Sequence, residues 1–183
     1  MKILAALALS LLLAGAGPAA YDVGPPVGVH IPAFSARDAT GAPRTLASVM
    51  GPKGLVLVFF RSSKWCPFCQ LQLLSLRDAA GPLAERGYRL AAISYQPPEE
   101  LADFTQKRAI NYILLSDAGS KTIDAFHLRD PQYPLGSFAY GVPQPSIFII
   151  APNGVIRAKI AYQGFKVRPD NPAILAAVDG LRH

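Results

Sequence analysis

Cysteine and histidine are scarce in this chain, and their scarcity limits the metal chemistry that it can support. The 183 residues include two cysteines and three histidines. The histidines, His30, His127 and His183, stand far apart, and no two have the spacing of a ligand pair. Tetrahedral zinc needs four ligands, or three and a water. Haem attachment needs a histidine directly after the second cysteine, where this chain has Gln70. We therefore expect no metal and no cofactor.

Long apolar runs are absent after the first twenty residues. The chain begins MKILAALALSLLLAGAGPAA, with a basic Lys2, an apolar run over residues 3–13 and then small residues. This order is typical of a secretory signal peptide, and we expect cleavage between Ala16 and Ala20. An uncleaved anchor is the alternative, although the run is short for a bilayer span. We expect a periplasmic or secreted protein with residues 1–20 as the signal peptide, residues 21–183 as one domain, and no stable membrane span after cleavage.

Runs of positive charge are absent too. The formal net charge is +6, and the basic residues are scattered along the chain. A nucleic-acid footprint concentrates Lys and Arg on one face or along one helix. We therefore expect an ordinary basic surface and no nucleic-acid partner.

What the sequence does contain is an alternation of apolar strands and amphipathic helices. GLVLVFF, residues 54–60, has the continuous apolar character of a strand buried on both faces. Further strands are expected over 88–95 and 111–117. The other expected elements are a hairpin and a short helical turn over 27–51, helices over 67–87 (with a possible break at Gly81 and Pro82), 97–109, 118–127 and 170–183, a loop over 128–141, and a hairpin with an Asn-Gly turn over 146–162. Such an alternation predicts an α/β fold, a sheet between layers of helices.

Both cysteines lie where the first long strand ends and the first long helix begins. In α/β sheets this carboxyl end of the strands is where chemistry takes place. Cys66 and Cys69 are three positions apart, and a disulfide across so short a loop removes little unfolded-state entropy. A purely structural bridge is therefore disfavoured, and the pair is interpreted as a reactive dithiol.

The two cysteines are expected to have different roles. Cys66 would lie at the helix N-terminus, where free amide groups and the helix dipole favour a thiolate. Arg61 and Lys64 would favour it further if they fold nearby. Cys66 is thus the expected nucleophile, and Cys69, one turn later, the resolving thiol.

Pro145 is a second candidate site residue. It directly precedes the apolar run SIFII, and a proline there belongs at the start of a strand, because it cannot donate to the sheet. A cis Gln144–Pro145 bond would turn the backbone toward a neighbouring site. An ordinary trans bond in a loop is the alternative.

Several stretches together resemble the thioredoxin fold, and more closely the redoxin group with peroxiredoxin-like (AhpC/TSA-type) proteins. They are LVLVFF, WCPFC with its helix, and Pro145 ahead of SIFIIAPNGVI, and the resemblance covers residues 24–182. It implies a central mixed sheet flanked by helices with an N-terminal β-hairpin. It also implies that Cys66 attacks, Cys69 resolves and a cis Pro145 flanks them. Trp65 matches the aromatic residue that commonly precedes the first cysteine.

The chain departs from the peroxiredoxin pattern at two places. Peroxiredoxins carry Pro-x-x-x-Thr/Ser-x-x-Cys; Ser63 fills the Thr/Ser position, but Phe59 replaces the proline. They also carry an Arg ahead of the late strand, where this chain has Pro145, so Arg61 and Arg168 are candidate substitutes. Thioredoxins, in turn, keep a buried carboxylate in the strand before the pair, and LVLVFF has none.

These observations support an exported, antioxidant-type thiol oxidoreductase that cycles Cys66 and Cys69 by thiol–disulfide exchange with a protein thiol, disulfide or reductant. The first alternative is a thiol peroxidase that reduces hydrogen peroxide or alkyl hydroperoxides through a Cys66 sulfenic acid. The second is a non-catalytic metal-binding or structural module.

Overall fold

The computed structural model describes residues 19–181, so the expected signal peptide lies almost entirely outside the described residues, as does His183. In chain order the elements are β1 (Ala36–Asp38), β2 (Pro43–Arg44), α1 (Leu46–Val49), β3 (Gly54–Phe59), α2 (Pro67–Glu85), β4 (Tyr88–Ser94), α3 (Pro98–Arg108), β5 (Ile113–Ser116), α4 (Lys121–Ala125), β6 (Ser146–Ile150), β7 (Ile156–Ile160) and α5 (Asn171–Asp179).

The strands form one mixed sheet with the order β2-β1-β5-β4-β3-β6-β7. β3, β4 and β5 are parallel to one another, whereas β6 is antiparallel to both β3 and β7. β1 and β2 form the expected N-terminal hairpin at the other edge of the sheet. The α/β fold with a mixed sheet and an N-terminal hairpin is confirmed.

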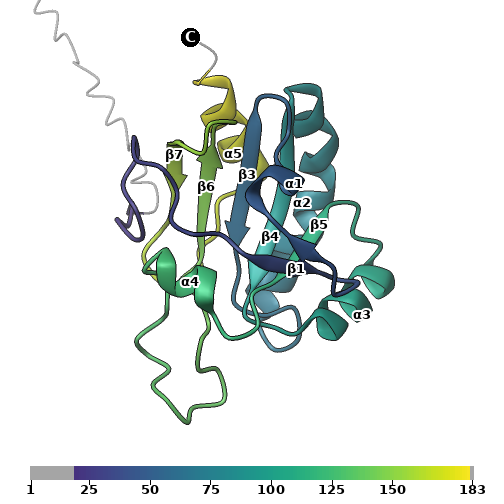
Figure 1. Cartoon of the computed structure of the whole chain (residues 1–183), viewed down its shortest axis with the longest axis vertical. Coiled ribbons are helices and arrows are strands. Elements are labelled where there is room, and N and C mark those ends of the chain that lie inside the picture. Colours follow the sequence, from purple (N-terminus) through teal and green to yellow (C-terminus); the bar gives the residue numbers. More distant parts are fainter. Residues whose placement is uncertain (1–18, 182–183) are drawn as a thin grey trace, which may run out of the picture.

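Helices cover both faces of this sheet (Figure 1). On one face, Val56 and Val58 of β3 share an apolar cluster with α2, α3 and α5. On the other, Leu55, Leu57 and Phe59 pack with α1, α4 and the chain near Val23. Because both faces are covered, every position of β3 is buried, which explains its unbroken apolar sequence.

Helix α2 passes through Gly81 and Pro82 without the break that the sequence allowed for. Proline in a helix interior removes one backbone hydrogen bond and crowds the preceding turn. Here Leu83, in the turn that contains Pro82, is fully buried in the core. Packing of this last turn outweighs the local preference. Within residues 19–181, no helix is both long and apolar enough to cross a membrane.

Candidate functional site

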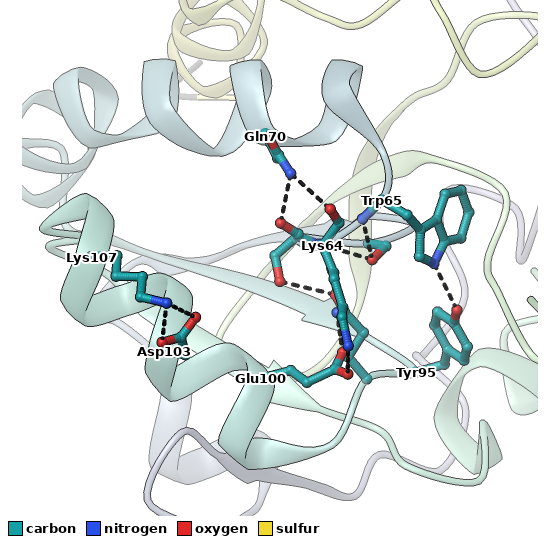
Figure 2. A network of polar contacts seen from close by, with 10 residues as sticks. Lys64, Trp65, Gln70, Tyr95, Glu100, Asp103 and Lys107 are labelled. Atoms are coloured by element: carbon teal, nitrogen blue, oxygen red, sulfur yellow. Dashed lines mark hydrogen bonds and ion pairs between the residues drawn. The ribbon is translucent and has the colours of Figure 1, made fainter.

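A tight turn carries the chain from β3 to the first cysteine. The Ser62 hydroxyl accepts hydrogen bonds from the amides of Lys64 and Trp65, at 3.0 and 3.3 Å. From the first turn of α2, the Gln70 amide group donates back to the carbonyls of Ser63 and Lys64, at 2.9 and 3.1 Å. Figure 2 shows these hydrogen bonds between Gln70 and the turn. They tie the turn to the helix and so set where α2 begins.

The cysteine pair lies at the start of α2, as expected. Cys66 is the N-cap residue, Pro67 occupies the first turn, and the amide of Cys69 donates to Cys66 Sγ at 3.3 Å. The two sulfurs form a disulfide. Cys66 is 2% exposed and Cys69 is fully buried, so Cys66 is the more accessible of two sheltered sulfurs. A first-turn amide of α2 therefore faces the sulfur that was predicted to attack.

Arg61 lies in the turn between β3 and the cysteine pair and is 1% exposed. Its guanidinium carbon is 4.3 Å from the ring centroid of Phe165, 5.1 Å from that of Tyr133 and 5.3 Å from that of Trp65. Its Nη2 donates to the Tyr133 hydroxyl at 2.5 Å and is 4.0 Å from the Asp130 carboxylate. Aromatic faces and one carboxylate thus hold a buried cation beside the site.

A second guanidinium reaches the sulfurs directly. Arg168 Nη2 is 3.4 Å from Cys69 Sγ, within hydrogen-bonding distance of a sulfur. Burial and the charge of Arg61 lower the pKa of Arg168 to about 10. Arg168 therefore stays protonated at neutral pH. The sequence named Arg168 only as a candidate substitute for the family arginine; the structure brings Arg168 to Cys69 and places Arg61, the other candidate, where its charge acts on Arg168.

Ser63 and Lys64 are engaged on the opposite side of the turn. The amide and hydroxyl of Ser63 both donate to the Gln96 side-chain oxygen, at 2.6 and 3.1 Å. The Lys64 ammonium is exposed and pairs with Glu100 at 3.1 Å (Figure 2). Gln96 also donates to Glu100. These contacts fasten the turn to α3, and they join Ser63 to Gln96 and Lys64 to Glu100 rather than to a sulfur.

Trp65 has a packing role and a polar role. Its indole N–H donates to the Tyr95 hydroxyl at 3.1 Å (Figure 2). Its ring lies 5.3 Å from that of Phe138 and 6.4 Å from that of Tyr133, between ring centroids. Burial raises the pKa of Tyr95, so this hydroxyl stays protonated at neutral pH.

Pro145 occupies the expected place but not the cis conformation. It directly precedes β6, and the Gln144–Pro145 bond is trans, because no described peptide bond is cis. Pro145 lines a cavity of about 340 Å³ together with Gln144, Asp130 and Phe165. The expected cis bond is therefore wrong, and the trans alternative is the observed one.

Sequence reasoning missed the residues that reach the site from distant segments. They are Gln96 after β4, Asp130 and Tyr133 in the loop before β6, and Phe165 after β7. No local motif marks these residues, since each depends on which strand ends are neighbours. Within residues 19–181, no three His, Cys, Asp or Glu side chains are grouped in a way that could hold a metal ion.

The thioredoxin-like fold and the cysteine pair at a helix N-terminus define a thiol-based oxidoreductase. Comparison with known proteins specifies the group: a profile described as the AhpC/TSA family matches residues 27–159. The chain belongs to the AhpC/TSA family.

Individual relatives agree with this assignment. The chain is 29% identical over 144 residues to peroxiredoxin Bcp of Escherichia coli (strain K12), covering 79% of this chain and 89% of the relative. Among solved structures, peroxidoxin BcpB from Mycobacterium tuberculosis superposes with a TM-score of 0.72 at 24% identity, covering 88% of this chain and all of that one. A thiol peroxidase from Chromobacterium violaceum gives a TM-score of 0.72 at 18% identity, over 93% and 95% of the two chains. The two superpositions show the shared fold.

Proposed function

We propose that this protein is an exported thiol peroxidase of the peroxiredoxin type that acts through Cys66 and Cys69. The observation that carries the proposal is a disulfide-forming pair at the start of α2 in a chain of the AhpC/TSA family. The sequence alone ranked thiol–disulfide exchange first. The relationship to a protein named peroxiredoxin favours the peroxidase instead.

The proposed cycle has an oxidative half and a reductive half. The Cys66 thiolate attacks one oxygen of a peroxide ROOH, the O–O bond breaks, and the RO⁻ that leaves takes a proton to become ROH. Cys66 is then a sulfenic acid. The Cys69 thiolate attacks the Cys66 sulfur, hydroxide leaves and is protonated to water, and the disulfide forms. Two electrons from an external thiol reductant restore the dithiol.

The test is peroxide consumption by the reduced protein. Cys66→Ser should abolish rapid consumption of hydrogen peroxide, because serine supplies no thiolate. Cys69→Ser should allow one turnover and leave a sulfenic acid that dimedone traps. Wild-type protein with both thiols alkylated is the matched control. Rapid consumption by Cys66→Ser would contradict the assignment of Cys66 as the attacking sulfur.

Disulfide exchange with a protein partner is the second candidate. Apolar side chains beside the pair favour it, since Phe138, whose ring packs against Trp65, is 76% exposed and nearby Leu135 is 82% exposed. Such a surface suits contact with an unfolded or extended chain. Reduction of insulin disulfides by the reduced protein should be rapid if exchange is the main activity, and no faster than with free dithiothreitol if it is not.

Export rests on the first twenty residues. A charged start, an apolar run and small residues together have the order of a secretory signal peptide. Expression of the full chain in a Gram-negative host should yield periplasmic protein whose N-terminal residue lies between Gly17 and Tyr21. Recovery of a cytoplasmic protein that still begins at Met1 would contradict it.

A further inference from the structure

The contact between Arg168 and Cys69 would be electrostatically stronger in the reduced protein, where Cys69 can be a thiolate, than in the observed disulfide. In a disulfide neither sulfur carries a charge. The Arg168 guanidinium nevertheless lies 3.4 Å from the sulfur of Cys69, the fully buried cysteine of the pair. A hydrogen bond to an ionised acceptor is about twice as strong as one to a neutral acceptor. The arrangement therefore suits a Cys69 thiolate better than it suits the disulfide.

The surroundings of Arg168 show an excess of positive charge. Its Nε atom and that of Arg61 are both buried and lack a hydrogen-bond partner within residues 19–181. The Asp130 carboxylate lies 4.0 Å from Arg61, which also donates to the Tyr133 hydroxyl. Lys64 and Glu100 pair with each other on the α3 side. The buried guanidinium of Arg61, the partly buried one of Arg168 and the one carboxylate leave a net positive charge that a second anion would balance.

We propose that Arg168, supported by Arg61, holds Cys69 as a thiolate and thereby makes Cys69 the sulfur that leaves when the disulfide is reduced. This role rests on the proposed dithiol–disulfide cycle and adds a direction to it. Arg168 is the residue that contacts the reacting sulfur. Arg61 acts through the charge that it adds behind Arg168.

Reduction of the disulfide then takes place in two displacement steps. A reductant thiolate RS⁻ attacks Cys66 Sγ, the more accessible sulfur, and the Cys66–Cys69 bond breaks. The electron pair of that bond passes to Cys69 Sγ, which leaves as a thiolate beside Arg168. A second RS⁻ attacks the sulfur of the bound reductant, RSSR departs, and Cys66 leaves as a thiolate at the N-terminus of α2. A leaving thiol of lower pKa leaves faster, so Arg168 accelerates the first of these steps.

The lowered pKa of Arg168 agrees with this role. Burial, and then the charge of Arg61, make the protonated guanidinium less favourable when the sulfurs are uncharged. Reduction supplies the missing negative charge. The same thiolate is the nucleophile that attacks a Cys66 sulfenic acid, so Arg168 serves both halves of the cycle.

The first test measures the ionisation of Cys69 alone. In a Cys66→Ser protein Cys69 is the one remaining thiol, because the chain has two cysteines. Its rate of alkylation by iodoacetamide across a pH series gives the midpoint of ionisation. Arg168→Met should raise this midpoint by about one to three pH units, the effect of removing a close opposite charge. Arg168→Lys should restore most of the difference.

Arg157→Met is the matched control, because Arg157 is an exposed arginine of β7. It should leave the midpoint unchanged. Equal midpoints in the Arg168→Met and Arg157→Met proteins would overturn the proposal. Thermal unfolding verifies that each variant is folded, and Arg168→Gln is used with the same criteria if Arg168→Met fails to fold.

The second test follows reduction of the disulfide by dithiothreitol in the otherwise unaltered chain. The single tryptophan, Trp65, directly precedes Cys66, so its fluorescence reports the reaction. Arg168→Met should slow reduction by about three- to thirtyfold, and Arg157→Met should not. An unchanged rate in Arg168→Met contradicts the leaving-group role. This reduction assay contains no peroxide, so its outcome does not depend on peroxidase activity. Slow peroxide consumption by the wild type would contradict the proposed peroxidase but not the role of Arg168.

Discussion

Individual charged residues in this protein are buried by different means. Arg61 lies among aromatic rings and donates to a tyrosine hydroxyl, so its charge is balanced largely by ring faces. Asp38, only 8% exposed, instead accepts hydrogen bonds from Thr40, Ala42 and Arg44. The first arrangement leaves a positive charge that acts on Arg168. The second satisfies a carboxylate completely and has a structural role.

Asp38 provides a prediction for the pH dependence of stability. Its burial alone would raise its pKa, but the hydrogen bonds from Thr40, Arg44 and Ala42 outweigh burial and lower the pKa to about 2. The pKa is thus lower in the folded chain than in the unfolded chain. The stabilisation is fully present above about pH 4 and is lost as the pH falls toward 2.

Asp38→Asn should therefore lower the free energy of unfolding by about 1–2 kcal/mol at neutral pH and by much less near pH 2. Urea titrations at several pH values measure this difference. A difference between the two proteins that stays constant from neutral pH to pH 2 would contradict the assignment.

At the scale of elements, α2 has two roles, because it positions both sulfurs and also buries one face against the sheet. Its start is well defined by local sequence: Pro67 suits the first helical position, and Cys66 serves as the N-cap. Its end was harder to predict, since Gly81 and Pro82 both disfavour helix. Burial of Leu83 decided the outcome, and burial is a property of the assembled core.

Gly81 gives a test of that interpretation. A Cβ added there would meet nothing within 4 Å, and the backbone at Gly81 is helical. Gly81→Ala should therefore raise the free energy of unfolding by about 0.5–1 kcal/mol, because alanine restricts the unfolded chain more than glycine does.

Gly119 is the matched control, since a Cβ there is equally free of contacts but φ is +94°. Gly119→Ala should lower the stability by about 1 kcal/mol or more, because an L-residue is strained in that region. Denaturant midpoints measure both variants. A loss of stability in Gly81→Ala would show that the end of α2 is not held in the helical conformation described.

At the scale of the whole molecule, the site forms where three strand ends meet. β3 ends at Phe59, which pairs with Ser146 at the start of β6, and Ile147 pairs with Ile160 at the end of β7. The segments attached to these ends carry the cysteine turn, the loop with Asp130 and Tyr133, and Arg168. Residues more than a hundred positions apart, Arg61 and Arg168 among them, therefore share one charged environment.

We expect the core that supports this site to be largely independent of the disulfide. Cys66 and Cys69 are separated by three positions, and closing so small a loop stabilises a chain by about 2 kcal/mol at most. We expect the reduced protein to keep its fold, with a denaturant midpoint only slightly below that of the oxidised protein. Circular dichroism during urea titration, with and without dithiothreitol, measures this. Unfolding upon reduction alone would show that the bridge is a structural staple after all.

The sequence by itself determined the order of strands and helices, the placement of the cysteine pair at a helix N-terminus and the family resemblance. These features follow from local patterns: an apolar run for β3, a change to helical periodicity after Pro67, an Asn-Gly turn before β7. The preference for a peroxidase over the exchange reaction that the sequence ranked first comes from comparison with relatives and remains a proposal.

Only the tertiary structure decided which side chains reach the sulfurs. Lys64, next to the pair in sequence, turns to Glu100, whereas Arg168, distant in sequence, contacts Cys69. The trans Gln144–Pro145 bond was equally undetermined. The physical reason is that periodicity and turn chemistry act over a few residues, while the neighbours of a buried charge depend on strand order and register, which form through contacts between distant segments.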